Sequence, residues 1–277
     1  MMLATLGRPE LNEADGASVA PSTTVARVAL VVEYDGTRYF GFQFQDNRPT
    51  VQAELEKAIT RLTGEPTRVV ASSRTDTGVH AIGQVVSFRT GSALPMSSFV
   101  SGLNHYLPRD VAVRTAHRLA AGFHVQRTAV SRHYEYRILN RPTRSPIEAT
   151  HSYLVREPLD VGLMHEAARA LLGEHDLASF TGVTGARMKS TVRRVDRAEV
   201  RRDGDLVVFT IVASSFLPHQ VRNTVGALVE VGRGRLSPGD FASLIERKEP
   251  GLAGPRAPAS GLYLVRVNYP RPFEEEA

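Results

Sequence analysis

The stretch SSRTDTGVHA, residues 72–81, brings together residue types that can support acid–base or covalent chemistry. Asp76 is expected in a tight loop after a strand, because Gly78 and the small residues Thr75 and Thr77 suit a sharp turn. A carboxylate presented by such a turn can act as an acid, a base or a nucleophile. The spacing alone leaves open that Asp76 only accepts hydrogen bonds within its own turn.

Arg74 lies two positions before Asp76, on the same side of the chain if the backbone stays extended. From there its guanidinium would keep the Asp76 carboxylate ionised by Coulomb attraction, and it would also be able to hold a phosphate. His80, near the end of the stretch, is expected to be packed or at the surface rather than catalytic.

Sequence patterns for several other kinds of site are missing. His165 and Glu166 are not followed by the second histidine of the zinc-binding HExxH pattern, and no GxxxxGK phosphate loop occurs. The chain has no cysteine, which excludes disulfides, thiolate nucleophiles and cysteine metal sites. A serine triad stays an alternative, although no GxSxG elbow is present. We therefore expect neither a metal nor a cofactor.

The charge of the chain favours a polyanionic partner. It has 34 Lys and Arg residues against 29 Asp and Glu, a net charge of +5 and a pI near 9.7. Arginine binds phosphate oxygens bidentately and stacks on bases, so RNA or DNA is the expected partner, with a solvated basic face as the alternative. The arginines gather in two segments: Arg127, Arg132, Arg137, Arg141 and Arg144, and then Arg187, Lys189, Arg193, Arg194, Arg197, Arg201 and Arg202.

The ends of the chain and its hydropathy place limits on location. No run of about 18 apolar residues occurs, so no membrane span is expected. Residues 1–26 lack the basic start and apolar stretch of a secretory signal and are expected to form a disordered tail, and residues 270–277 a second short tail. Together with the absence of cysteine, these features favour a cytoplasmic location.

Hydrophobic periodicity between the tails predicts one order of elements twice. A strand, a helix, two strands, a helix and a strand are expected first, at 27–34, 50–64, 67–72, 83–90, 97–107 and 110–119. The same order follows, with a hairpin at Asp203-Gly204 and one extra helix, at 132–140, 160–173, 191–213, 217–232, 237–248 and 261–270.

A βαββαβ unit that occurs twice predicts an α+β fold made of two ferredoxin-like halves, residues 27–125 and 126–269. We expect the halves to share a mostly antiparallel central sheet, with helices on one face and an RNA-binding cleft on the other. RNA-recognition domains use this topology, although the fold alone does not imply the function.

Five separated blocks of the sequence resemble successive blocks of the tRNA pseudouridine synthase A family, in the family's order. The resemblance extends from about residue 27 to residue 269. The blocks are EYDGTRYFGFQFQ (33–45), SSRTDTGVHA (72–81), SRHYEYRILN (131–140), FLPHQVRNTVGALVEVG (216–232) and GLYLV (261–265).

The resemblance implies an isomerase that converts uridine to pseudouridine at positions 38 to 40 in the anticodon stem-loop of tRNA, without cofactor or metal, usually as a homodimer. It implies that Asp76 is the essential acid and that Tyr134 lies against the target uracil. It also implies that Arg222 pairs with Asp76 from the opposite half of the cleft, in a pocket that Arg74 also lines. The arginine-rich segments are the expected phosphate contacts.

Alternatives remain for each of these residues. Tyr134 would otherwise be a core tyrosine, an interpretation that Tyr136 keeps, and Arg222 would otherwise be a surface residue. Either Asp76 or the Tyr134 hydroxyl is a candidate for removing the C5 proton of uracil. The alternative function is a non-catalytic tRNA-binding protein or RNA chaperone on the same fold, and a nuclease is a third.

Two positions depart from the family pattern, and two more lie beside Arg222. Thr77 stands where the family most often has alanine, and Phe42 where it has tryptophan. Neither change removes a reacting group. His219 and Gln220 are possible RNA contacts without an assigned role.

Overall fold

The computed structural model describes residues 25–120, 122–182, 190–271 and 273. Most of both expected tails lies outside the described residues, as do Arg187 and Lys189 of the second arginine-rich segment. None of the helices in the described part is long and apolar enough to cross a membrane.

The N-terminal half follows the predicted order of elements. Its helix α1 begins after Thr50, whose hydroxyl accepts a hydrogen bond from the Ala53 amide, and ends at Gly64 in the left-handed conformation (φ 74°). These are the two caps that the sequence predicts. The elements are β1 (Ala26–Tyr34), α1 (Val51–Thr63), β2 (Val70–Ala71), β3 (His80–Thr90), α2 (Met96–Tyr106) and β4 (Val111–Arg118).

The C-terminal half repeats the order with additions. Two short strands, β6 and β7, were not predicted, because three or four residues are too few to show a period and β7 is largely polar. The elements are β5 (Ser131–Asn140), β6 (Tyr153–Val155), α3 (Val161–Arg169), β7 (Gly173–Asp176), β8 (Val192–Asp203), β9 (Leu206–Ala213), α4 (Gln220–Gly232), α5 (Pro238–Arg247) and β10 (Leu262–Asn268), with 3-10 turns at Ala178–Phe180 and Ala259–Gly261.

All the strands of the described part join one ten-stranded sheet in the order β4-β1-β3-β10-β5-β9-β8-β7, with β2 beside β3 and β6 beside β5. The two halves meet where β3 lies parallel to β10, with His80 opposite Tyr263 and Ala81 opposite Leu264. Apart from the short β5–β6 pair, the other pairs are antiparallel. The α+β class and the mostly antiparallel sheet are confirmed, whereas the division at residues 125 and 126 stays a prediction.

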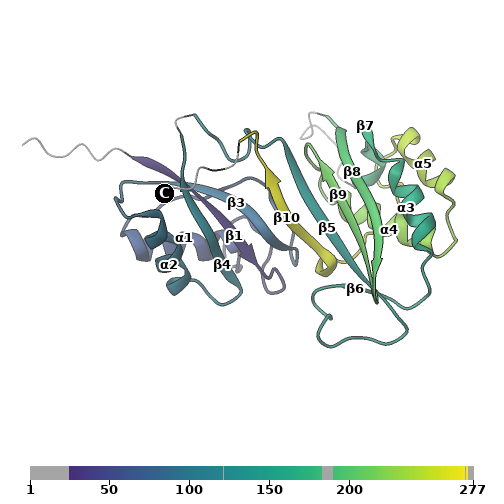
Figure 1. The fold of residues 1–277 in the computed structure, drawn as a ribbon, viewed down its shortest axis with the longest axis horizontal. Coiled ribbons are helices and arrows are strands. Elements are labelled where there is room, and N and C mark those ends of the chain that lie inside the picture. Colours follow the sequence, from purple (N-terminus) through teal and green to yellow (C-terminus); the bar gives the residue numbers. More distant parts are fainter. Residues whose placement is uncertain (1–24, 121, 183–189, 272, 274–277) are drawn as a thin grey trace, which may run out of the picture.

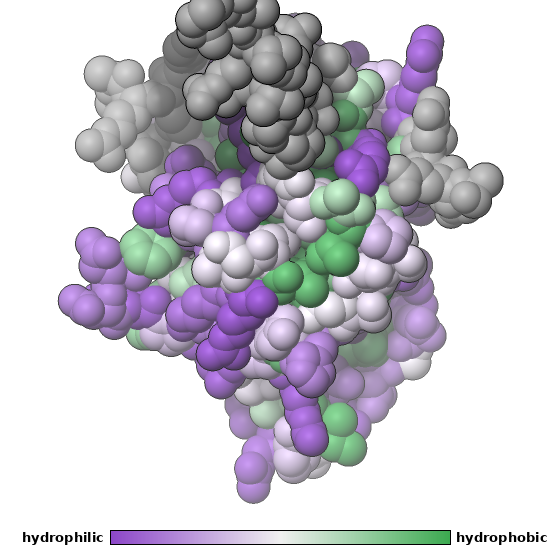
Figure 2. All heavy atoms as spheres, turned by 90° about the vertical axis from the view of Figure 1, so that its left-hand side faces the viewer, coloured by the Kyte–Doolittle hydropathy of each residue, from purple (hydrophilic) through white to green (hydrophobic). Residues whose placement is uncertain are grey.

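The helices lie in two groups, α1 and α2 with the N-terminal half and α3 to α5 with the C-terminal half (Figure 1). Seen from the end of the N-terminal half, the described surface is largely hydrophilic, with a band of apolar side chains near its centre (Figure 2). The middle of the molecule, between the two helix groups, contains the β3–β10 seam.

The two faces of the central strand β5 differ in chemistry. Tyr134, Tyr136 and Ile138 alternate with their neighbours and therefore share one face, where they are buried in the core that α3 and α4 also enter. The opposite face carries Glu135 and Arg137, both only partly buried. The strand thus presents Tyr134 and Tyr136 to the helices, and Glu135 and Arg137 to the other side.

Candidate active site

The loop that carries Asp76 connects β2 to β3 and is fastened by the segment after β1. The Thr75 carbonyl accepts a hydrogen bond from the Phe42 amide (3.1 Å), and the Gly78 amide donates one to the Tyr39 carbonyl (3.3 Å). The Thr75 hydroxyl lies 2.7 Å from the Tyr34 hydroxyl in a buried hydrogen bond. Thr75 is therefore anchored inside while the next residue, Asp76, stays half-buried at the surface.

Glycine is required where the two segments approach each other. Gly41 has φ 85°, and a Cβ there would lie 2.8 Å from the Thr75 carbonyl oxygen. Gly78 has φ 78° and allows the chain to turn directly after the motif, as the sequence predicts. Gly41 and Gly78 thus allow the backbone of the loop to adopt this shape, because glycine tolerates close packing and positive φ.

Two side chains at the start of α4 contact the Asp76 carboxylate. His219 Nδ1 lies 2.8 Å from Asp76 Oδ2, and Arg222 Nη1 lies 3.5 Å from the same oxygen. Among the described residues, no hydrogen bond or ion pair reaches Asp76 Oδ1. One carboxylate oxygen is therefore held, and the other is left available.

Arg222 is itself fixed by the protein. Its Nε donates a 2.8 Å hydrogen bond to the Ala257 carbonyl, and its side chain is only 16% exposed. Burial lowers the pKa of the Arg222 guanidinium, and the nearby Asp76 charge acts in the opposite direction. The expected pairing of Arg222 with Asp76 across the two halves is present in the geometry.

Tyr134 reaches the same region from β5. Its hydroxyl lies 2.9 Å from the Ser73 hydroxyl, and its ring meets Phe216 edge-on with centroids 5.0 Å apart. Burial raises the pKa of Tyr134 to about 12, although the Ser73 hydrogen bond lowers it somewhat. The Tyr134 phenol is consequently protonated at neutral pH.

A hollow of about 450 Å³ lies between these groups. The segment from Ser215 to Arg222 lines one side of it, and the loop from Ser72 to Asp76, with Tyr134 and Leu262, lines the other. A second hollow of about 410 Å³, bordered by Phe40 and Phe42, shares Asp76 with the first. The carboxylate therefore stands on the wall between two hollows.

The position of the first hollow differs from the expected cleft. We expected the cleft on the sheet face opposite the helices, but Tyr134 lies on the face that α4 covers, and α4 itself contributes Val221 and Arg222 to the lining. The physical reason is that the two helix groups lie toward the two ends of the sheet, with the β3–β10 seam between them (Figure 1), and the loop from Ser72 to Asp76 lines the hollow beside α4.

Arg74 is not brought to Asp76. Its side chain is exposed and borders both hollows, and in the described part of the chain it forms no ion pair with the carboxylate. The chain bends at residues 72–73 and turns at residues 77–78, on either side of the two residues, and a spacing of two does not bring the side chains together here. The partners of Asp76 are His219 and Arg222 instead.

Comparison with known proteins identifies the family of this arrangement. A sequence model described as tRNA pseudouridine synthase matches residues 30–126 and 167–270, which is more than half of the chain. The chain belongs to the tRNA pseudouridine synthase family. Asp76, His219 and Arg222 fall inside the matched segments, whereas Tyr134 lies between them.

Curated relatives named tRNA pseudouridine synthase A support this family membership. The relative from Pelobacter propionicus is 44% identical over 242 residues, which cover 87% of this chain and 99% of the relative. The relative from Geobacter sulfurreducens is 43% identical over 242 residues, with the same coverage. The relative from Aliivibrio fischeri is 43% identical over 248 residues, covering 90% of this chain and 94% of the relative.

His219 is the contact of this family member that sequence reasoning missed. It has a left-handed backbone (φ 62°), and 143 residues separate it from Asp76. Neither feature shows in a local pattern; its place three residues before Arg222 was the one available signal. Tyr136, by contrast, is buried in the core, as the sequence predicted. Its hydroxyl lies 2.7 Å from the Pro258 carbonyl.

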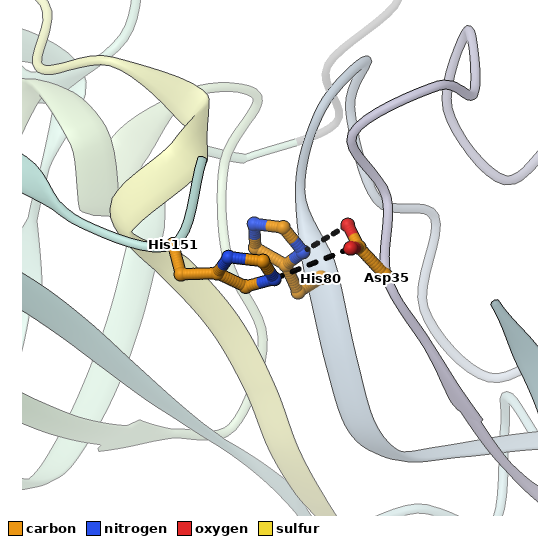
Figure 3. Close-up of side chains that lie close together, drawn as sticks. All are labelled: Asp35, His80 and His151. Carbon is orange, nitrogen blue, oxygen red and sulfur yellow. Dashed lines mark hydrogen bonds and ion pairs between the residues drawn. The ribbon is translucent and has the colours of Figure 1, made fainter. Parts of the chain in front are cut away.

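One group of side chains in the described residues has the composition of a metal site: Asp35, His80 and His151 (Figure 3). His80 Nδ1 accepts a 3.1 Å hydrogen bond from the Gly36 amide, and His80 Nε2 lies 3.0 Å from the Thr150 carbonyl. The lone pair of Nδ1 is therefore already engaged, and Nε2 carries the proton.

The ring arrangement of this cluster also disfavours a metal. The His80 and His151 rings stack, with centroids 5.0 Å apart and planes 21° apart, so their in-plane lone pairs do not converge on one ion. His151 Nε2 instead lies 3.2 Å from Asp35 Oδ2. His151 also stacks on His80, whose Nδ1 lies 3.1 Å from Asp35 Oδ1, and we name the three residues the back-face cluster.

Proposed function

We propose that this member of the tRNA pseudouridine synthase family converts uridine to pseudouridine at positions 38 to 40 in the anticodon stem-loop of tRNA, without a cofactor, with Asp76 as the essential carboxylate. The observation that carries the proposal is the position of the Asp76 carboxylate. It borders the first hollow, which Tyr134 also lines, and His219 and Arg222 hold it through one oxygen.

The reaction requires little more than one ionised carboxylate. Breaking the bond between N1 and C1′ builds positive charge at C1′, which Asp76 stabilises or attacks. The uracil then turns, C5 bonds to C1′, the C5 proton leaves and N1 gains a proton, so the product is an isomer of the substrate. Attack at C1′ and attack on the uracil ring both remain consistent with this geometry.

The protonation state of Tyr134 favours one of the two candidates for removing the C5 proton. With a pKa of about 12, the Tyr134 phenol is a hydrogen-bond donor and a poor base at neutral pH. The Asp76 carboxylate is then the group better suited to accept the proton. Tyr134 instead offers an aromatic surface for the uracil, and such stacking contributes about 1–3 kcal/mol toward the cost of flipping a base out of a stem.

The partners are part of the same proposal. We propose that the arginine-rich segments contact the tRNA phosphates, since guanidinium groups bind phosphate well. We further propose, as the family resemblance implies, that the protein acts in the cytoplasm as a homodimer in which one tRNA contacts both subunits.

The test is to treat tRNA that carries no modification with the purified protein and then to map the uridines that have become pseudouridine. We expect pseudouridine at one or more of positions 38 to 40 without added metal or cofactor, and none with Asp76→Asn. Salt-sensitive tRNA complexes without product would instead indicate a non-catalytic tRNA-binding protein. Cut strands would indicate a nuclease.

A further inference from the structure

We propose that His219 is a positioning residue for the reaction at Asp76. It holds Oδ2 of the carboxylate so that Oδ1 stays directed at the substrate. This inference rests on the proposed function, because it assumes that Asp76 is the reacting carboxylate.

The distances make His219 the closer of the two groups that hold Asp76. The 2.8 Å separation between His219 Nδ1 and Asp76 Oδ2 is that of a strong charge-assisted hydrogen bond, whereas Arg222 Nη1 is at 3.5 Å. An ionised carboxylate only accepts, so the proton of this bond resides on His219 Nδ1. His219 therefore sets the rotation of the Asp76 carboxylate, and Arg222 adds charge.

The backbone of His219 supports a role for its side chain. His219 has φ 62° and ψ 3°, a left-handed conformation that is uncommon for residues other than glycine, although asparagine, aspartate and histidine adopt it more often than the rest. It stands at the N-cap of α4 without a capping side-chain hydrogen bond. Histidine tolerates this conformation but supplies no cap, and its side chain is instead hydrogen-bonded to Asp76.

Neighbouring hydrogen bonds fix this conformation from both sides. The Thr181 hydroxyl donates to the Pro218 carbonyl (3.0 Å), and the Gln220 amide oxygen accepts from the Leu217 amide (2.9 Å). On the helix side, the His219 carbonyl accepts from the Asn223 amide (3.0 Å). The imidazole is thus presented to Asp76 by a segment that is braced before substrate binds.

Three substitutions of His219 separate the effect of its side-chain donor from the effect of its left-handed backbone. In His219→Asn the side-chain nitrogen occupies about the place of Nδ1, and asparagine tolerates the left-handed conformation. His219→Gly keeps that conformation and removes the donor. His219→Gln places its nitrogen further out, near the place of Nε2. The control is Lys248→Gly, which removes a side chain from another left-handed residue (φ 53°) at the end of α5.

Single-turnover rates, kcat and KM for tRNA are measured for all four variants and for Asp76→Asn. We expect His219→Gly and His219→Gln to lower the single-turnover rate and kcat by about 10- to 100-fold, with KM changed less than about 3-fold. We expect His219→Asn to recover most of that loss and Lys248→Gly to keep the wild-type kcat. The thermal midpoint of His219→Gly should equal or exceed that of the wild type, because glycine relieves the backbone.

Three results would overturn the inference. They are a wild-type kcat in His219→Gly, a raised KM with kcat unchanged, which would make His219 an RNA contact, and a His219→Asn variant as slow as His219→Gly. Asp76→Asn separates the two levels of the argument. If it loses turnover while His219→Gly keeps it, only this inference fails; if it keeps full turnover, the proposed function fails first.

Discussion

The Asp76–His219 pair and the back-face cluster of Asp35, His80 and His151 both adjoin the stretch of residues 72–81. Their two carboxylates differ in how many hydrogen-bond acceptor positions remain free. The Asp76 side chain is 36% exposed and that of Asp35 is 38% exposed, so exposure does not distinguish them. Asp35 Oδ1 accepts hydrogen bonds from the amide and the hydroxyl of Thr37, and Oδ2 is bonded by His151. Within the part of the chain that the structure describes, the Asp76 carboxylate is held only through Oδ2.

The difference shows that free acceptor positions on the carboxylate, and not the pairing of histidine with aspartate, distinguish Asp76, the proposed reacting group, from Asp35. Burial acts to raise the pKa of Asp35, but the Thr37 hydrogen bonds and the two histidines outweigh it and lower that pKa. Both oxygens of the resulting carboxylate are engaged by hydrogen bonds. It joins the end of β1, the start of β3 and the segment before β6 (Figure 3).

The back-face cluster also braces the loop that presents Asp76. Gly36 donates to His80, and a Cβ on Gly36 would collide with the Val79 carbonyl, so these segments are in tight contact. Val79 in turn closes the motif turn by donating to the Asp76 carbonyl (3.1 Å). The back-face cluster thus supports, through Gly36 and Val79, the loop that presents the Asp76 carboxylate.

The largest expected effect comes from Asp76→Asn. It should lower kcat by about 10⁴-fold, the upper end of what a positioned acid or base contributes, because the amide neither attacks carbon nor accepts a proton. Release of tritium from tRNA labelled at C5 of uridine measures the loss. The stability of the variant should be close to that of the wild type, and a variant that turned over normally would remove the distinction between the two aspartates.

Arg222→Lys tests the charge beside Asp76 at constant sign. Lysine cannot reproduce both the Nε bond to the Ala257 carbonyl and the approach of Nη1 to Oδ2. We expect kcat to fall by about 10²-fold through misplacement of the carboxylate, with tRNA binding retained. Equal kcat in the variant and the wild type would show that position matters less here than charge.

Asp35→Ala should reverse the pattern seen for Asp76. Removing the acceptor of Thr37 and His151 should lower the free energy of unfolding by about 1 kcal/mol, a modest value because the group is partly exposed. Urea unfolding measures this change, and single-turnover kinetics at saturating tRNA should change less than about 3-fold. A loss of kcat as large as that of Asp76→Asn would place Asp35 in the chemistry.

The pH dependence of stability should report the same cluster. Burial lowers the pKa of His80 below its ordinary 6.5, with the Asp35 charge opposing and the His151 charge adding to the shift. The folded protein therefore keeps His80 neutral while the unfolded chain takes up a proton as the pH falls below about 6.5. The contribution is complete above that pH and is lost as the pH decreases.

Urea midpoints at pH 7.5 and pH 5.5 test this direction in the wild type and in His80→Asn. The drop toward pH 5.5 should be smaller in the variant. It should not vanish, because burial also lowers the pKa of His133. The lowered pKa of Asp35 affects stability only at more acidic pH, below its ordinary 3.8. An identical drop in both proteins would mean that His80 is accessible to protons in the fold.

Local chemistry in the sequence predicted much of the fold. The cap at Thr50, the glycine at position 64 and the Asp203-Gly204 turn each specify a structure through a few neighbouring atoms, and each is present. The repeated order of strands and helices then predicted the α+β sheet. The short strands β6 and β7 were missed because their pairing depends on the sheet already formed beside them.

The candidate site was predictable in its residues more than in its contacts. The motif drew attention to Asp76, and the family resemblance to Tyr134 and Arg222. The contact of His219 with Asp76 required a left-handed residue and the approach of two distant segments, which no local pattern contains. Arg74 was placed beside Asp76 from its spacing of two, but its side chain is exposed and forms no ion pair with the carboxylate in the described part of the chain.

Arg74→Gln provides the smallest expected effect. It tests whether contact with the carboxylate matters more than nearness in sequence, because Arg74 lies nearer in sequence to Asp76 than His219 or Arg222, the two residues that hold it. Since Arg74 is exposed and borders both hollows without pairing with Asp76, its proposed partner is a tRNA phosphate. Affinity should fall by a few-fold at low salt, and the slope of log K against log salt should decrease by about 1. A change in kcat as large as that of Arg222→Lys, with the salt slope unaltered, would instead mean that Arg74 turns toward the carboxylate once tRNA is bound.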